Sequence, residues 1–153
     1  MQGCGVTQAV LLTPAADQQR AKAEMEKRPG CFVRSVRTDP IQPDAGKVLR
    51  DALRGGAVSV GEMKFHVAQD SQEMRRVYDI AAELQVPVMM HIQTFPHFDG
   101  ELPYNTGYTE FDKILRAYPR TNLSDTATCS GLTSVPMSRP TAAIRRELPN
   151  LAD

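Results

Sequence analysis

Hydrophobic positions along the first 122 residues form short apolar runs separated by longer amphipathic stretches. The runs at 5–12, 31–36, 57–65 and 86–91 are rich in β-branched residues and are bounded by Gly, Pro or Asp. Runs of this length and composition predict buried β-strands. The fourth run, "VPVMMH", is apolar for five residues and ends on His91, which marks the end of this strand as a candidate for chemistry.

The stretches between the runs have the 3.6-residue period of amphipathic helices. A charged helix is expected over 17–28, and a second after Asp44, which we expect to cap it before Gly55 ends it. The clearest helix follows Asp70, which forms a capping-box pattern with Glu73 and precedes an apolar stripe of Met74, Val77, Tyr78, Ala81 and Leu84. Thr109 is expected to cap the last one, which carries Phe111, Ile114, Leu115 and Tyr118.

Strands that recur at helix-length intervals predict the α/β class, because parallel strands need crossover connections. Two architectures fit the pattern: an open doubly wound sheet, and part of a (β/α)8 TIM barrel of four to five βα units. A complete barrel needs about 250 residues, and the chain has 153. We therefore expect a partial barrel if the second architecture holds. The chain contains no Gly-x-Gly-x-x-Gly and no Gly-Lys-Ser/Thr phosphate loop.

Composition narrows the function classes further. The 18 basic and 18 acidic side chains cancel, so no nucleic-acid or anionic-membrane partner is expected. No apolar run approaches the roughly 20 residues of a membrane-spanning helix, and the first residues lack a signal-peptide pattern. Three widely spaced cysteines, Cys4, Cys31 and Cys129, do not suggest a disulfide framework. We expect a cytoplasmic protein with a small-molecule substrate.

Polar side chains end the third and fourth strands, where ligands meet α/β sheets. Glu62 and Lys64 share one face of their strand by period-two alternation, as His91 and Gln93 do of theirs. Imidazole and carboxylate are common metal ligands. The alternative is a hydrogen-bonded rim histidine beside a Glu62–Lys64 ion pair. Two further histidines, His66 and His97, are expected in an exposed loop and an exposed turn. The alternative for His97 is a position at the mouth of a pocket with Phe95 and Phe98.

At these residues the sequence resembles the amidohydrolase-related family of the metal-dependent hydrolase superfamily. The resembling segments span about 5–122 and read "GVTQAVLLTP", "RTDPIQPDAGKVLRDALRGGAVSVGEMKF", "YDIAAELQVPVMMHIQ" and "FDKILRAYPRTN". The resemblance implies a TIM barrel with a divalent metal, Zn or Mn, at the C-terminal face. It also implies hydrolysis of C–N or ester-type bonds, or decarboxylation of aromatic acids.

Carried onto this chain, the resemblance makes His91 a metal ligand and places Glu62 or Lys64 at the family's fourth-strand position. We assign Glu62 to the metal and Lys64 to catalysis, and the sequence leaves the choice between them open. The chain lacks the family's His-x-His pair, and no histidine follows His97. We therefore expect this chain to hold metal weakly and to be inactive alone. The alternatives are a half-barrel that self-associates without catalysis and an open-sheet ligand-binding module.

The chain divides by pattern into a partial barrel over 1–122 and an irregular tail over 123–153, rich in Ser, Thr and Pro. We hypothesise that a reading-frame shift near Leu123 produced this tail. Read one base earlier, the codons of Asp125 and Thr126 give Tyr or His, and those of Ser130 and Gly131 permit Trp. The shifted reading resembles the segment that follows the fifth βα unit in the family, where Gly-His and Trp occur.

Overall fold

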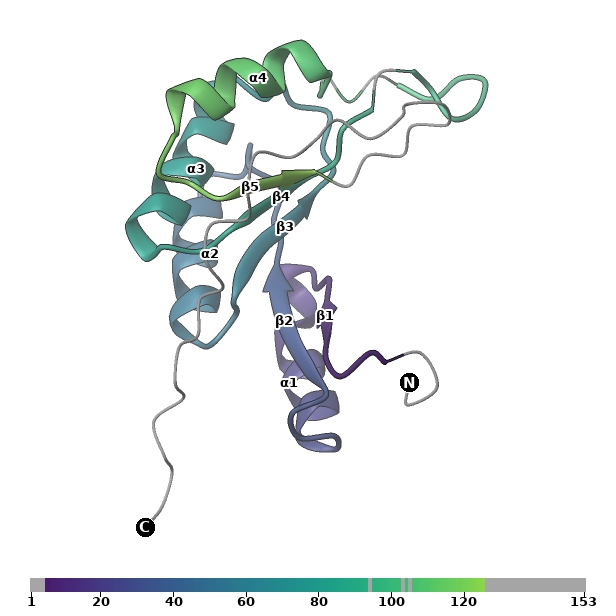
Figure 1. Ribbon diagram of the computed structural model, residues 1–153, viewed down its shortest axis with the longest axis vertical. Coiled ribbons are helices and arrows are strands. Elements are labelled where there is room, and N and C mark those ends of the chain that lie inside the picture. The colour runs from purple at the N-terminus through teal and green to yellow at the C-terminus, as the bar shows by residue number, and fades with distance from the viewer. Residues whose placement is uncertain (1–4, 94, 103, 105, 126–153) are drawn as a thin grey trace.

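The computed structural model of the chain describes residues 5–93, 95–102, 104 and 106–125, and it has the predicted α/β class (Figure 1). Five strands form one parallel sheet: β1 (Ala9–Leu11), β2 (Phe32–Val36), β3 (Ser59–Met63), β4 (Val88–Met90) and β5 (Leu123–Asp125). Between them lie the 3-10 turn η2 (Ala15–Asp17) and helices α1 (Gln18–Glu26), α2 (Ala45–Arg54), α3 (Gln72–Leu84) and α4 (Tyr108–Ala117).

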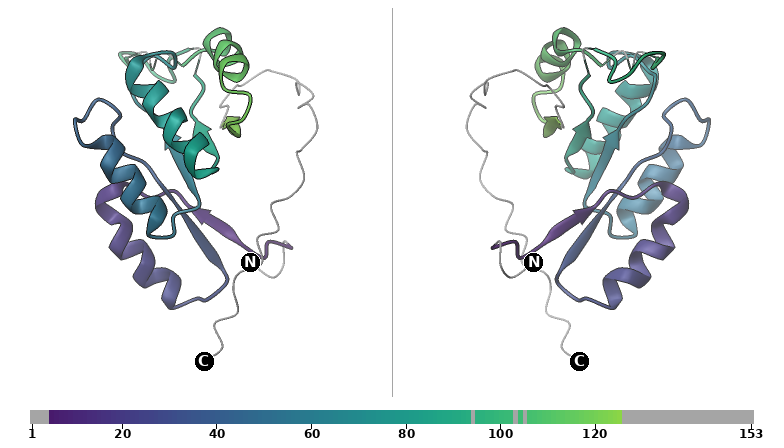
Figure 2. Two further views of the ribbon diagram at one scale, coloured as in Figure 1. Left: turned by 90° about the vertical axis from the view of Figure 1, so that its left-hand side faces the viewer. Right: turned by 90° about the vertical axis from the view of Figure 1, so that its right-hand side faces the viewer.

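The strands lie in the sheet in chain order, β1-β2-β3-β4-β5. Right-handed crossovers between successive parallel strands place every connecting helix on the same face, and Figure 2 shows the helices gathered on one side of the sheet. The described sheet is open, with β1 and β5 as its two edge strands. No reversal of strand order, such as a doubly wound sheet has at its switch point, occurs among these five strands.

The hydrophobic core lies between this helical layer and the sheet. Alternate side chains of the central strands face the helices, and the buried cluster comprises Val36, Val60, Met63, Val88, Met90 and Ile92 with Leu49, Leu53, Met74, Val77, Tyr78, Ile80, Ala81 and Ile114. Period-two alternation in β4 then turns Met89, His91 and Gln93 to the opposite face. The polar side chains of interest therefore lie on the face that the helices do not cover.

The helices form where the pattern predicts, but their N-terminal caps differ from those expected. Ser71, not Asp70, caps α3: it is extended (φ −65°, ψ 159°), and its hydroxyl accepts from the Met74 N–H. Asp44 is the residue before α2, yet its backbone is nearly helical (φ −97°, ψ 2°) and its side chain caps nothing. Thr109 lies inside α4, which Gly107 precedes. The caps of α3 and α4 are thus displaced by one and two residues, as is common at helix ends, whereas Asp44 is at the expected position without making the expected hydrogen bond.

The first three residues of the expected irregular tail form strand β5. Leu123 pairs with Val88 and Asp125 with Met90, in parallel register, on the edge of β4 that would otherwise be uncovered. Leu123 also packs against the core, so pairing and burial override a local pattern with no strand alternation. The rest of the tail, 126–153, lies outside the described residues, as do Cys4 and Cys129.

Two further findings concern membrane-spanning helices and cysteine in the described part of the chain. Among the described helices, none combines the length and the apolar character needed to cross a membrane. Cys31 has a free thiol and is partly buried.

Candidate functional site

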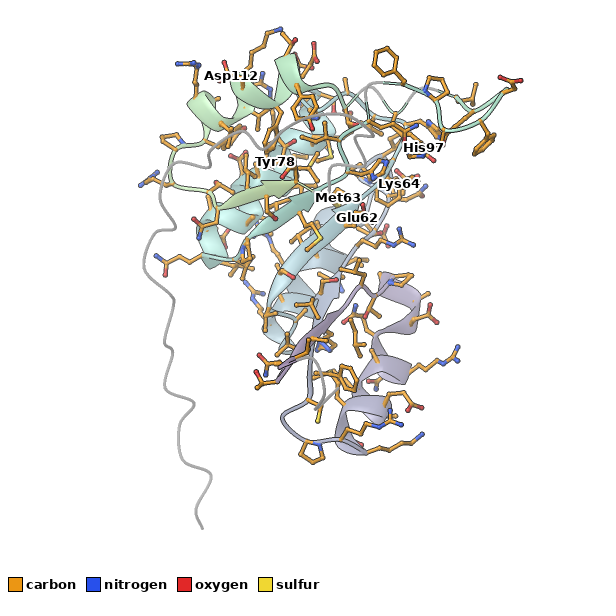
Figure 3. All side chains as sticks on the ribbon, turned by 45° about the vertical axis from the view of Figure 1, so that its right-hand side comes forward. Glu62, Met63, Lys64, Tyr78, His97 and Asp112 are labelled. Carbon is orange, nitrogen blue, oxygen red and sulfur yellow. The ribbon has the colours of Figure 1, made fainter. Side chains whose placement is uncertain are left out.

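The carboxyl ends of β3 and β4 bring Glu62 and His91 into contact. Nδ1 of His91 lies 3.0 Å from Oε1 of Glu62, and the His91 residue is only 3% exposed. Figure 3 shows Glu62, Lys64 and His97 together at this end of the sheet. The polar residues at these strand ends were expected to converge, and the structure brings the carboxylate and the imidazole within hydrogen-bond distance.

Glu62 reaches His91 because β3 is irregular at this point. Strict alternation from Val60, which lies in the core, would turn Glu62 toward the helices, away from His91. The register with β4 instead shifts between Val60 and Met63, so that both of these residues face the core. A bulge of this kind re-aims a side chain, and here it turns the carboxylate to the face that His91 occupies. Glu62 therefore lies on the face expected for it, but a bulge in β3, and not simple alternation, places it there.

Gly61 makes this irregularity possible. Its φ of +125° is a conformation that L-residues rarely adopt. A Cβ atom at this position would overlap the carbonyl oxygen of Met89 and lie 2.9 Å from the Met89 Cβ. The backbone of β3 thus approaches β4 as closely as only glycine permits.

The second ring nitrogen of His91 is also engaged. Nε2 lies 2.8 Å from Oε1 of Gln93, and the Gln93 amide nitrogen donates to Oε2 of Glu101 at 2.7 Å. The same carboxylate oxygen accepts the backbone N–H of His97 at 2.6 Å. His91 is therefore the centre of a hydrogen-bonded chain that runs from β3 into the loop after β4.

The two hydrogen bonds to Glu101 favour its ionised form. The backbone N–H of His97 and, next among the favourable contacts, the Gln93 amide hold the pKa of the Glu101 carboxyl below its usual range, and the nearby charges of His97 and Lys64 lower it further. The backbone supports the same arrangement, since the Gln93 N–H donates to the Thr106 carbonyl oxygen at 3.2 Å. Side-chain and backbone hydrogen bonds thus both hold the loop after β4 against the end of the strand.

Histidine rings and the ammonium group of Lys64 lie around the ring of Tyr104. The His66 ring stacks on it with 4.2 Å between centroids, the His91 ring meets it edge-on at 5.5 Å, and Lys64 Nζ lies 5.0 Å from its centroid. The His97 and His91 rings are 6.1 Å apart in an edge-on arrangement. The region is therefore rich in cationic and aromatic groups around two carboxylates.

The predicted site residues differ in whether they join the hydrogen-bonded chain. Glu62, His91 and Gln93 form one hydrogen-bonded chain, whereas Lys64 lies beside it over Tyr104. His66 and His97 are exposed, as expected, but both contact rings of the site. Glu101 and Tyr104 were not predicted as site residues, because nothing in the composition of a long loop indicates which of its residues fold back onto a strand.

The described residues do not by themselves fit a bound metal ion. No group of three or more His, Cys, Asp or Glu that could hold an ion occurs among them. Both nitrogens of His91 lie within hydrogen-bond distance of protein oxygens, so a metal ion would have to displace one of these partners. The contact of Glu62 with Nδ1 of His91 nevertheless resembles the hydrogen bond by which a carboxylate orients a metal-bound histidine.

Comparisons with known proteins identify no family for the sequence. No protein-family model matches the sequence, and no curated protein matches it.

Proposed function

We propose that this chain forms part of the barrel of a metal-dependent hydrolase of the amidohydrolase-related family, acting on C–N or ester-type bonds or decarboxylating an aromatic acid. The observation that carries the proposal is the 3.0 Å contact between His91 and Glu62. It joins an imidazole and a carboxylate at the carboxyl ends of adjacent parallel strands, where α/β barrels hold their sites.

The sheet topology supports a barrel segment over the open-sheet alternative. A doubly wound sheet reverses its strand order and carries helices on both faces. The five strands described here keep chain order, and their helices lie on one side (Figure 2). Successive βα units in a barrel have this arrangement. The uncovered face, with Met89, His91 and Gln93, then corresponds to the barrel interior.

The contacts suggest a role for each candidate residue. Glu62 engages Nδ1 of His91 and fixes the orientation of its ring, so Nε2 is the nitrogen that would bind a metal. Lys64 is our candidate catalytic residue, since its ammonium lies over Tyr104 at the same edge. A bound Zn or Mn would lower the pKa of a water molecule and polarise the substrate. With one imidazole available, we propose that this chain binds metal weakly and has no activity alone.

Titration with Co²⁺ tests the proposal, followed by calorimetry and by the absorption of the bound ion. We expect weak, saturable binding that His91→Ala abolishes. His66→Ala is the matched control, because that ring is exposed and stacks on Tyr104. Binding that survives in His91→Ala, or no binding at all, would contradict the metal role. Tight stoichiometric binding would contradict the incomplete site.

Self-association is a second candidate function, favoured by the edge strand β1. Val10 in β1 and Leu12 directly after it are 44% and 47% exposed. Leu12 also lines an open groove of about 360 Å³, together with residues that include Phe32 and Ala21. Exposed apolar strand edges favour pairing between chains. Light scattering should show oligomers that Leu12→Lys weakens and Ile41→Lys, a change at an exposed residue elsewhere, does not. A monodisperse monomer would rule this candidate out.

A further inference from the structure

Strand β1 presents a hydrogen-bonding edge that no other described strand covers. The Ala9 N–H donates to the Cys31 carbonyl oxygen at 3.0 Å, so the peptide groups of Ala9 face β2. Peptide groups of successive residues in a strand point to opposite sides. Those of Val10 and Leu12 therefore point away from the sheet, where a further strand could pair with them.

Strand β5 presents the complementary edge at the other end of the sheet (Figure 1). The Asn122 carbonyl oxygen accepts from the Val88 N–H at 2.8 Å, so the peptide groups of Leu123 and Asp125 point away from β4. A strand that continues the sheet beyond β1 in parallel, with its helices on the same face, must present this same edge to β1.

The groove beside β1 adds an apolar surface and a charge to that edge. It lies between β1 and α1, and its lining includes Leu11, Phe32 and Ala21. The exposed side chain of Arg20 on α1 also lines it. A strand placed against β1 would therefore meet apolar side chains and a guanidinium group on its helix-covered side.

The helix-covered face of β5 matches this groove in polarity and in charge. Leu123 packs toward the core, and period-two alternation puts the exposed Asp125 on the same face. If Val10 lies opposite Ser124 of a second copy, Asp125 of that copy lies beside Leu11 and faces the groove that Arg20 lines. Within the described residues, neither Arg20 nor Asp125 forms a salt bridge, so both charges are available for this contact.

We propose that a second copy of this chain docks head to tail on β1, with its β5 in parallel register and its Asp125 paired with Arg20. The proposal rests on self-association as a candidate function, and it names the two surfaces involved. Because these surfaces differ, the contact is heterologous, and each copy can use both of its edges. An arginine and a carboxylate can form two parallel hydrogen bonds, which would fix the register of the two strands.

A charge exchange followed by light scattering over a concentration series tests the proposal. Arg20→Asp and Asp125→Arg should each weaken self-association about tenfold, because each brings two like charges together. An equal mixture of the two variants should regain wild-type association, and so should the double variant, since acid then faces base at every contact. Arg76→Asp, at an exposed position on the central helix α3, is the matched control and should change nothing.

Recovery in the double variant would also show that neither substitution acts by unfolding the chain. Association that Leu12→Lys weakens but Asp125→Arg does not would indicate two-fold pairing of β1 with β1, which overturns the head-to-tail contact and keeps self-association. Failure of both the mixture and the double variant to recover would overturn the contact as well. A wild-type chain that stays monomeric at every concentration removes both ideas, whereas the metal role is decided separately by the Co²⁺ titration.

Discussion

The backbone carbonyl of Met89 lies so close to Gly61 that a Cβ atom at position 61 would overlap it. This approach, with the positive φ of Gly61, accompanies the register shift that turns Glu62 toward His91. Gly61→Ala should therefore lower the free energy of unfolding by about 2 kcal/mol or more and weaken the Glu62–His91 contact. Urea denaturation measures the first effect. Gly100→Ala, at a positive-φ turn with open space around it, is the control that should cost less.

Removing the Glu62 carboxylate should leave Nδ1 of His91 without its partner. Because His91 is buried, we expect Glu62→Ala to destabilise the chain by about 1–3 kcal/mol. Glu26→Ala, at an exposed helical position, should change stability by no more than about 0.5 kcal/mol. Equal effects of the two substitutions in thermal or urea unfolding would show that the contact contributes nothing.

Acid should release the loop after β4. The pKa of Glu101 is lowered in the folded chain, so its contribution is complete above the unfolded value of about 4.3 and is lost as the pH falls through the lowered folded value. We expect the protection of the His97 amide proton, which is its exchange rate relative to the intrinsic rate at the same pH, to fall in this acid range. In Glu101→Gln this loss of protection should be absent. Protection of the His97 amide that does not change with pH in the wild-type chain would contradict the assigned hydrogen bond.

The hydroxyl of Tyr78 joins α3 to the loop before it. It donates to the Gln69 carbonyl oxygen at 3.0 Å, and burial raises the pKa of Tyr78 far above its usual value, so the phenol keeps its proton. Tyr78→Phe should cost about 1–2 kcal/mol, since it leaves that carbonyl unpaired. Tyr118→Phe retains the ring contact at 5.1 Å and should be nearly neutral in the same unfolding experiment.

The coding DNA should carry a family-like segment in the alternative frame. Asp125 pairs with Met90, the residue before His91, and the frame read one base earlier gives Tyr or His directly after that position. We predict an open frame there that encodes a strand ending in histidine. Sequencing the gene decides this, since a frame interrupted by stop codons would end the hypothesis.

The sequence predicts most of the fold because its apolar periods are strong. The stripe through Met74, Val77 and Tyr78 is buried as expected, and four of the five strands follow apolar runs. Strand β5 could not be predicted, since Leu123–Asp125 has no strand pattern of its own and forms against the edge of β4. Helix caps were displaced because adjacent polar residues compete for the same position, and backbone angles decide between Asp70 and Ser71.

The candidate site was predictable only in part. Placement at the strand ends follows from topology, which brought Glu62, His91 and Gln93 to one edge. The direction of the Glu62 side chain depends on a register shift at Gly61, and periodicity cannot show where a strand is irregular. Glu101 lies beyond the strand in a long loop, and its contacts depend on how that loop returns to Gln93.

The location of a bound cation shows whether His91 is a metal ligand. Crystals of the chain soaked in Zn²⁺ and measured at the zinc absorption edge would show the ion by anomalous scattering. We predict a peak about 2.0–2.1 Å from Nε2 of His91, with Glu62 still on Nδ1 and the Gln93 side chain turned away. A peak bound elsewhere, with His91 still hydrogen-bonded to Gln93, would contradict it.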